Sequence, residues 1–392
     1  MPALHTGLIF AAVAAVASAA PTTDNTSAAS SNILAKRAVC SYTGTINPTT
    51  VASDAPGCSS ITFNGITVPK GQSLDLSKLT KGTTVTFQGH NTWLAQVGFD
   101  DSLLKIGGTD IIVTGAAGAR LDGQGAQYWD GLGSNGPTPK PKFLAAHNLL
   151  GTSAINNLYL LDTPVQAVSI NGCNGLKVNK MTIDNKSGNS LPANKMPHNT
   201  DGFDIGASSN IVIDGAIVDN QDDCVAINSG TGITFQNGQC NGGHGLSVGS
   251  VGHGSSTASN TVSNVQFLNN KISNSSNGIR VKSFVDGKGS IDKVTYKGIT
   301  LSGITKYGIL IEQNYNGGDL PKNVAPGTGV PITGLTIDNI IGGNGVVASG
   351  TNVAIECGNC SGWTWTSTVN VTGGKKFSCV GTPSAVPAGT CA

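Results

Sequence analysis

Charged residues are scarce in this sequence. Lys, Arg, Asp and Glu together make up 11% of its 392 residues, against about 25% in an ordinary soluble domain. The formal net charge is only +1 at pH 7. A nearly neutral chain gives no electrostatic basis for binding nucleic acid or an anionic membrane surface. We therefore expect neither nucleic acid nor membrane as a partner.

Long apolar runs are also missing beyond the N-terminus, so no later segment is expected to cross a bilayer. The N-terminus itself has an apolar run from Leu8 to Ala17, followed by the small residues Ala17-Ser18-Ala19. This run is too short for a membrane span, and it lies where a secretory signal peptide lies. We predict a signal peptide at residues 1–19 and a secreted, extracellular protein.

A dibasic pair, Lys36-Arg37, ends the polar segment that follows this signal peptide. Such a pair is typical of a processing site, and an exposed pair without that role is the alternative. We predict a propeptide at residues 20–37 and a mature domain at residues 38–392. Removal of the leader leaves 21 basic and 21 acidic residues, so the mature chain is expected to be neutral.

The nine cysteines fit a secreted protein, in which most of them should be paired. Local clustering favours four pairs, although spacing alone does not fix the connectivity. The favoured pairs are Cys40–Cys58, Cys224–Cys240, Cys357–Cys360 and Cys379–Cys391. Cys173 then remains as a buried free thiol. Sequons, which can carry glycans where their loops are exposed, lie at Asn185, Asn274, Asn359 and Asn370.

Glycine is abundant, at 54 residues, and Asn, Ser and Thr are frequent throughout. Val, Ile and Leu recur steadily between these polar residues, which is not the composition of a disordered chain. Short β-branched runs separated by Gly, Asn and Asp continue from about Ile61 to Ile355, with no convincing long helix among them. The composition predicts a long all-β protein with many tight turns.

One apolar register repeats in the middle of the chain. Five segments have apolar residues at their second and fourth positions, as a strand with one buried face does. The segments are Gly202-Phe203-Asp204-Ile205, Cys224-Val225-Ala226-Ile227, Gly245-Leu246-Ser247-Val248, Gly278-Ile279-Arg280-Val281 and Gly308-Ile309-Leu310-Ile311. Each repeat contributes a strand and no crossover helix, which fits the coils of a solenoid.

This register predicts a right-handed parallel β-helix, a single-stranded solenoid of about ten coils. We expect Leu74–Leu79 to form a short amphipathic turn that covers the N-terminal end of the stack. A β-propeller or an antiparallel sandwich is the alternative. Antiparallel order would not predict a register that is shared at one-coil intervals.

Polar residues gather just before the aligned positions. The alignment was made on the apolar residues alone, so it did not require the polar residues to coincide. Asp201 and Asp223 fall one above the other on adjacent coils, with Asp222 beside them and His244 one coil on. Carboxylates at such close range raise one another's pKa. One carboxyl can then stay protonated while another is ionised, as an acid–base catalyst requires. Asp204, which has a similar pattern, is interpreted as solvated or structural.

Two cationic residues, Arg280 and Lys282, occupy the third and fifth aligned positions, on the face opposite to the apolar core. Cations there suit an anionic substrate, and Arg280 can hold a sugar carboxylate with two hydrogen bonds. Taken alone, Asp222-Asp223 would more often be a turn or a calcium site. Calcium stays an alternative here, although Arg280, Lys282 and His244 disfavour a bound cation.

These residues resemble the signature of the fungal polygalacturonases of glycoside hydrolase family 28. The resemblance covers residues 38–392 and includes a downstream tyrosine, matched to Tyr315. Its four motifs, in the family's order, are Asn199-Thr200-Asp201-Gly202, Gln221-Asp222-Asp223, Gly243-His244-Gly245 and Arg280-Val281-Lys282. Val281 stands where the family more often has isoleucine, and it is expected to face the core.

The resemblance implies hydrolysis of α-1,4-linked galacturonan with inversion at the anomeric carbon, without metal or cofactor. It implies that Asp222 is the general acid and that Asp201 and Asp223 hold and deprotonate the attacking water. His244 would assist protonation of the acid. Inversion leaves room for a water, so acid and base carboxyls are expected roughly 6.5–9.5 Å apart. The implied substrate-binding residues are Arg280, Lys282, Tyr315 and Asn199.

Three rival functions stay open. A rhamnogalacturonan or xylogalacturonan hydrolase of the same family is the nearest, and the pairing of Arg280 with Lys282 favours a plain galacturonate backbone instead. A pectate lyase would need a calcium-carboxylate cluster and an arginine base. A non-catalytic β-helix that adheres to cell-wall glycan would leave the alignment of Asp201, Asp223 and their polar neighbours unexplained. Endo action is favoured, because the resemblance is to endo-acting members and no long insertion is apparent near the motifs. We expect a monomer that acts on polygalacturonate or pectin.

Overall fold

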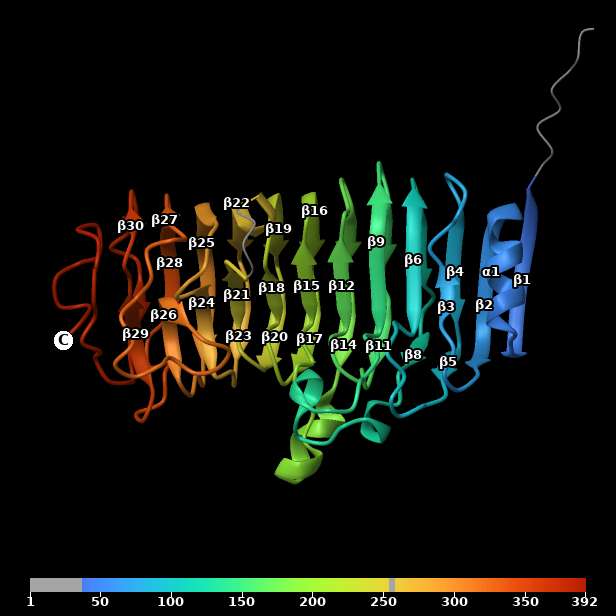
Figure 1. The fold of residues 1–392 in the computed structure, drawn as a ribbon, viewed down its shortest axis with the longest axis horizontal. Coiled ribbons are helices and arrows are strands. Elements are labelled where there is room, and N and C mark those ends of the chain that lie inside the picture. The colour runs from blue at the N-terminus through green and yellow to red at the C-terminus, as the bar shows by residue number, and fades with distance from the viewer. Residues whose placement is uncertain (1–36, 254–257) are drawn as a thin grey trace, which may run out of the picture. The chain divides into compact units, whose positions relative to one another are not determined.

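The computed structural model describes residues 37–253 and 258–392, so the predicted signal peptide and all but the last residue of the predicted propeptide lie outside it. From Arg37 onward the described chain coils into a solenoid of parallel strands, whose successive turns follow one another along the stack (Figure 1). No helix of the described residues is both long and apolar enough to cross a membrane.

One sheet of ten strands takes a single strand from each coil, and its spatial order is the order of the sequence. This sheet forms the floor of the site described below. Its strands are β3 (Leu74–Leu76), β6 (Leu104–Thr109), β9 (Leu144–Leu150), β12 (Val168–Asn171), β15 (Phe203–Gly206), β18 (Val225–Ile227), β21 (Leu246–Val251), β24 (Asn277–Phe284), β26 (Tyr307–Tyr315) and β29 (Thr351–Glu356).

The other 22 strands pair in two parallel runs that close the coils, and β2, β25 and β28 take part in both runs. The first run contains β1 (Ala38–Thr45), β2 (Cys58–Val68), β4 (Thr84–Gln88), β7 (Ile112–Gly115), β10 (Ala154–Asn156), β13 (Lys177–Asn179), β16 (Ser208–Asp214), β19 (Gly230–Gln236), β22 (Thr261–Leu268), β25 (Ser290–Ser302), β27 (Ile332–Thr333), β28 (Thr336–Gly342), β30 (Cys360–Ser361) and β31 (Thr364–Trp365). The second adds β5 (His90–Trp93), β8 (Arg120–Asp122), β11 (Tyr159–Leu161), β14 (Thr182–Asp184), β17 (Ile217–Asn220), β20 (Gln239–Gly242), β23 (Lys271–Ser273) and β32 (Asn370–Val371).

The predicted apolar register is confirmed in the ten-stranded sheet. Phe203 pairs with Val225, Val225 with Leu246, Leu246 with Ile279, and Ile279 with Ile309. All five side chains are fully buried, and each contributes about 1.5–3 kcal/mol to folding. Because side chains alternate along a strand, the residue after each of them faces outward. The prediction of a right-handed parallel β-helix is therefore confirmed.

The core runs inside the coils as columns of like residues. Aromatic rings stack between successive coils, with ring centroids 5.2 Å apart for Phe63 and Phe87 and 4.5 Å apart for Phe267 and Tyr296. Such stacked pairs stabilise the fold beyond the area that they bury. The regular column keeps each coil in register with the next.

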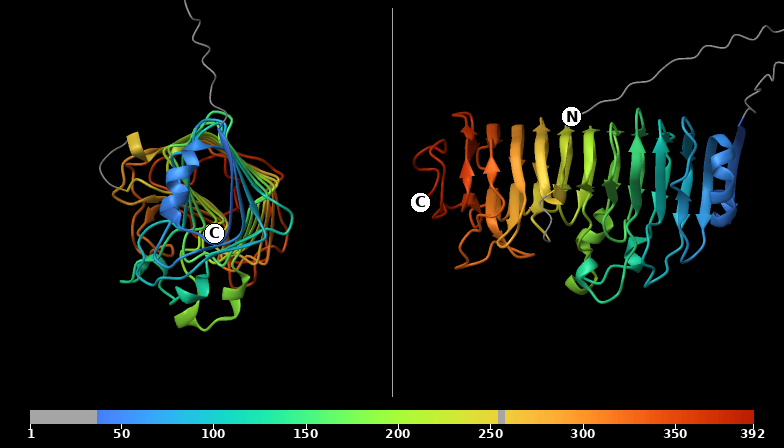
Figure 2. Two further views of the ribbon diagram at one scale, coloured as in Figure 1. Left: turned by 90° about the vertical axis from the view of Figure 1, so that its right-hand side faces the viewer. Right: turned by 45° about the horizontal axis from the view of Figure 1, so that its top comes forward.

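The N-terminal end of the stack differs from the prediction. Leu74 and Leu76 are buried with Asp75 between them, which is the period-two pattern of strand β3 and not of an amphipathic turn. The helix α1 (Pro48–Asp54) lies across this end instead (Figure 2). Its Val51 side chain is buried. Asn47 caps the helix, since its side chain accepts hydrogen bonds from two backbone N–H groups of the first turn.

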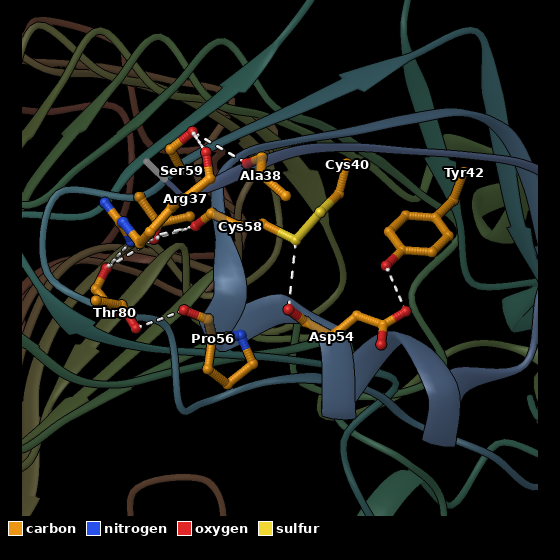
Figure 3. Close-up of a disulfide and its surroundings, with 10 residues drawn as sticks. Arg37, Ala38, Cys40, Tyr42, Asp54, Pro56, Cys58, Ser59 and Thr80 are labelled. Atoms are coloured by element: carbon orange, nitrogen blue, oxygen red, sulfur yellow. Dashed lines mark hydrogen bonds between the residues drawn. A yellow bond between two sulfur atoms is a disulfide. The ribbon is translucent and has the colours of Figure 1, made fainter. Parts of the chain in front are cut away.

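The predicted disulfides are all present, and Cys173 is a buried free thiol. Cys40–Cys58 fastens β1 to β2 (Figure 3). Arg37, the second residue of the dibasic pair, lies beside it and donates from Nη1 to Thr83 Oγ1 at 2.8 Å and to the Cys58 carbonyl at 3.1 Å. The other three bonds are Cys224–Cys240, Cys357–Cys360 and Cys379–Cys391.

Two long loops adjoin the motifs, so the expectation that no long insertion lies near them is wrong. Residues 123–143 connect β8 to β9, and residues 185–202 connect β14 to β15. The loops contact each other, because the Gly131 N–H donates to the Met196 carbonyl at 3.0 Å. Their 3-10 turns are Gly125–Gln127, Gly133–Asn135, Lys186–Ser190 and Ala193–Lys195, and a further one, Ala258–Asn260, precedes β22.

Candidate active site

The three predicted catalytic aspartates lie at the entry of neighbouring strands of the ten-stranded sheet. Asp201 comes two residues before β15, and Asp223 comes two residues before β18. The Gly202 N–H donates to the Asp223 carbonyl at 2.9 Å, which places the two backbones one above the other. Asp201, Asp222 and Asp223 are 8%, 7% and 1% exposed. The structure thus brings together the carboxylates that the register aligned.

Asp222 and His244 form an ion pair. His244 Nδ1 lies 2.9 Å from Asp222 Oδ1, and the same oxygen accepts the Asp223 N–H at 2.8 Å. Burial raises the pKa of Asp222, but the His244 imidazolium, the Lys282 ammonium and the Asp223 N–H together hold this pKa below its ordinary value. Asp222 in turn raises the pKa of His244 against the effect of burial. The pair therefore holds one proton between imidazole and carboxylate.

Both oxygens of Asp223 are hydrogen-bonded. Oδ2 accepts from Lys282 Nζ at 2.7 Å, and Oδ1 accepts from Ser247 Oγ at 2.5 Å. Burial lowers the pKa of Lys282, but Asp223 and Tyr315 together more than offset this effect, so the pKa of Lys282 is raised. These two bonds fix the orientation of the Asp223 carboxylate.

Asp201 is in a different state. Burial, with the charge of Asp222 as the next cause, raises its pKa well above the ordinary value. No hydrogen bond from the described parts of the chain reaches its carboxyl oxygens. Asp201 is thus a carboxyl with a raised pKa and without a side-chain partner in the described residues. The three aspartates differ in their surroundings and in their partners, as acid–base chemistry requires.

Atoms of three residues form a close cluster. One oxygen of Asp222, one of Asp223 and a ring nitrogen of His244 all lie within 4.8 Å of one another, because Asp222 and Asp223 are consecutive residues. The separation of roughly 6.5–9.5 Å expected between the acid and base carboxyls stays a prediction. Asp201 is not part of this cluster. The cluster also has metal-ligand atoms, but Lys282 and His244 already pair with its carboxylates.

The predicted substrate-binding residues gather around Tyr315. The Arg280 guanidinium lies 5.2 Å and Lys282 Nζ 5.3 Å from the centroid of its ring, within the range of cation–π attraction. Asn199 lies at the other side, where its Nδ2 donates to Asp222 Oδ2 at 3.4 Å. These four residues line a hollow of about 510 Å³ together with Asp222 and His244.

Two residues of the site were not predicted. Glu312 accepts from Nε and Nη2 of Arg280 at 2.9 and 2.7 Å, and Ser247 holds Asp223. Arg280 therefore has the edge formed by Nε and Nη2 occupied, and its expected two-bond grip on a sugar carboxylate stays a prediction. The repeat contained the signal for both residues. Ser247 is at the third aligned position, and Glu312 is at the fifth position of the last copy.

Two further hollows lie along the same sheet toward the N-terminus. One of about 410 Å³ is lined by Lys142, Ser169 and Asp204 among others, and one of about 550 Å³ is lined by Lys142 and His147 among others. Asp204 thus faces the first of these two hollows. Burial raises its pKa to about 7, with the charges of Asp223 and Asp222 adding to the effect and Lys142 opposing it.

Known proteins share the sequence and the fold. The profile of Glycosyl hydrolases family 28 matches residues 58–390. A probable endopolygalacturonase of Aspergillus fumigatus is 54% identical over 91% of this chain and 92% of its own length. An endopolygalacturonase of Emericella nidulans is 52% identical over 91% of this chain and 92% of its own length.

A solved structure matches as well. Endopolygalacturonase I from Stereum purpureum, complexed with two galacturonates, aligns with a TM-score of 0.71 at 37% identity and covers 86% of this chain and 96% of its own. A family profile over most of the chain, relatives above 50% identity and a shared solenoid lead to one assignment. The chain belongs to glycosyl hydrolase family 28.

Proposed function

We propose that this protein is an endopolygalacturonase, which hydrolyses α-1,4-galacturonosidic bonds within polygalacturonate. The observation that carries the proposal is the meeting of Asp201, Asp222 and Asp223 on neighbouring coils, beside Arg280 and Lys282. Three carboxyls in unlike states supply acid–base chemistry, and the two cations suit a polymer with a carboxylate on every sugar. A hydrolase of a substituted backbone has less support, since the relatives at 52–54% identity are named endopolygalacturonases.

In this proposal Asp222 is the general acid. The Nδ1 proton of His244 lies on the 2.9 Å contact with Asp222 Oδ1, so the pair stores the proton that the leaving glycosidic oxygen takes up. Asp222 lines the hollow and can reach that oxygen, whereas His244 acts through Asp222. Partial burial keeps bulk water from competing for this proton.

Asp201 and Asp223 hold the attacking water in the proposed mechanism. Asp223 is oriented by Lys282 and Ser247, and Asp201 has no partner among residues 37–253 and 258–392 for its carboxyl. One carboxylate can accept a proton from the water while the other carboxyl donates a hydrogen bond to it. Attack from the side opposite to Asp222 inverts the anomeric carbon.

The groove supports endo action, because hollows lined by Lys142 and His147 extend along the sheet beyond the aspartates. We also propose that the protein is secreted after removal of residues 1–19 and 20–37, and that it acts as a monomer. Arg37 is hydrogen-bonded to the first coils, so cleavage after Arg37 requires this side chain to detach first.

A digest of polygalacturonate with added chelator tests the function. Reducing ends should rise without new ultraviolet absorbance, and viscosity should fall early, as internal cleavage requires. Asp222→Asn should abolish the reaction, whereas the matched Asp292→Asn, in a partly exposed carboxylate of β25, should leave it intact. Absorbance that grows and disappears with chelator would show a lyase and overturn the assignment.

A further inference from the structure

Glu312 lies under the cationic end of the site and takes no part in the proposed mechanism. It pairs in register with Lys282 on the neighbouring strand. Its side chain is 0% exposed. A carboxylate is almost never buried to this degree unless a specific partner holds it, and here the partner is Arg280 at 2.7 Å.

The hydrogen bonds of Arg280 determine which of its donors can reach a ligand. A guanidinium has five N–H donors in a fixed fork. Nε and one N–H of Nη2 donate to Glu312 Oε1, and Nη2 also donates to the Gly318 carbonyl at 2.9 Å. Within the described residues, the two N–H groups of Nη1 have no hydrogen-bond partner. Arg280 lines the hollow, so Nη1 is the nitrogen that it can offer to a ligand.

Stability alone does not account for Glu312. Its second oxygen, Oε2, is buried and has no hydrogen-bond partner in the described chain, which is an unfavourable arrangement for a carboxylate. A buried ion pair also contributes little net stability, because the loss of hydration offsets the attraction. The pair must therefore be explained by what it does to Arg280.

We propose that Glu312 is a positioning residue for substrate binding, which fixes the Arg280 guanidinium so that Nη1 faces a galacturonate carboxylate. This inference rests on the proposed function. Asp223 fixes Lys282 in the same way, through a contact of 2.7 Å. Each of the two cations is thus oriented by a buried carboxylate of its own. A guanidinium that rotates would keep its charge and lose its alignment with the substrate.

Two conservative substitutions separate geometry from charge. Glu312→Gln keeps the acceptor at the same reach and removes the charge, so KM for polygalacturonate should stay within about twofold of the wild-type value. Glu312→Asp keeps the charge and withdraws the acceptor by one methylene. It should raise KM about tenfold, the effect of losing a charge-assisted hydrogen bond, with kcat within about twofold.

The next coil offers a matched control. Glu356 pairs in register with Glu312 and is only partly buried. Glu356→Gln and Glu356→Asp should leave KM unchanged. In the Arg280→Ala background, Glu312→Asp should cause no further rise of KM, because residues that act as a unit are not additive. A thermal unfolding scan of each variant confirms that KM is measured on folded protein.

Two outcomes overturn the inference. Wild-type KM in Glu312→Asp would show that Arg280 needs no support from Glu312. A rise of KM in Glu312→Gln as large as that in Glu312→Asp would show that the position of the acceptor does not account for the effect, because Glu312→Gln keeps this position. Both outcomes leave the proposed function intact, since the wild-type protein still hydrolyses polygalacturonate in them. Failure of the proposed function would appear earlier, as absence of hydrolysis in the wild-type digest.

Discussion

At the scale of the residue, the chemistry depends on how three carboxyls acquire different states within a few ångströms. Asp222 has an imidazolium beside it, Asp223 has an ammonium and a hydroxyl, and Asp201 has no partner in the described residues. The sequence predicted that the three meet, because apolar alternation fixes the backbone register. It did not predict which carboxyl carries a proton, because that depends on which side chains of neighbouring coils contact each carboxyl.

His244 should set the alkaline limit of activity. Its pKa is raised by Asp222, so the imidazolium persists above the ordinary pKa near 6.5 and is lost as pH rises through the raised value. In His244→Ala, Asp222 loses the imidazolium that lowers its pKa, so this pKa rises. The ordinary pKa of a carboxyl is nevertheless much lower than that of an imidazole. We expect kcat/KM to fall roughly tenfold to a hundredfold, and its alkaline limb to move to lower pH.

The pH profile of kcat/KM checks this expectation. His90 is a suitable control, because it pairs with Asp122 at 3.2 Å and its side chain is 57% exposed, outside the site. His90→Ala should leave the profile unchanged. An unaltered alkaline limb in His244→Ala would show that the ion pair does not hold the catalytic proton.

At the scale of the element, the site is a property of strand register. Phe203, Val225 and Leu246 pair in the order that the sequence repeat predicted, and this places Asp201 and Asp223 on adjacent coils. The loop of residues 185–202 was not predicted, because a loop has no periodicity that fixes its path. Glu312 was missed because strand register does not show where a side chain reaches. Its register partner is Lys282, yet its side chain contacts Arg280.

Gly202 tests the role of register directly. A Cβ at this position would lie 2.5 Å from the Cys224 carbonyl oxygen and 3.0 Å from Val218 Cγ1. Gly202→Ala must therefore displace β15 from β18 and shift Asp201 relative to Asp223. We expect a loss of roughly 1–3 kcal/mol in the free energy of unfolding, and a fall in kcat of up to about 100-fold.

Denaturant unfolding and steady-state kinetics measure the two effects. Gly57 provides the control, since a Cβ there would meet no atom within 4 Å. Gly57→Ala should change neither quantity. Full activity in Gly202→Ala, at unchanged stability, would contradict a site that depends on the close approach of these two strands.

At the scale of the whole chain, the repeated apolar register predicted the solenoid, because every coil has one strand with the same buried face. The composition predicted the many tight turns. The disulfide pairs were also predictable, since cysteines close in sequence lie on the same or neighbouring coils. The helix that covers the N-terminal end was not predicted, because α1 is short and buries few residues. The segment expected there, Leu74–Leu76, has the alternation of a strand.

The same coils decide which sequons can carry glycans. Asn185 is fully buried, and its amide donates to Thr163 Oγ1 at 2.9 Å and accepts from the Thr163 N–H at 2.8 Å. Asn370 is exposed on β32. We expect peptide mapping after enzymatic deglycosylation to find Asn185 unmodified and any glycan at exposed sequons such as Asn370. A glycan on Asn185 in the folded, active protein would contradict the described coil.

The central claim is that Asp201 and Asp223 direct a water at the side of the sugar opposite to Asp222. The anomeric configuration of the first product tests it most directly, and proton NMR during the first minutes of a polygalacturonate digest measures it. The account predicts that the β-anomer of the new reducing end appears first and then mutarotates. Initial appearance of the α-anomer would contradict the account, because a carboxylate would then attack the sugar in place of water.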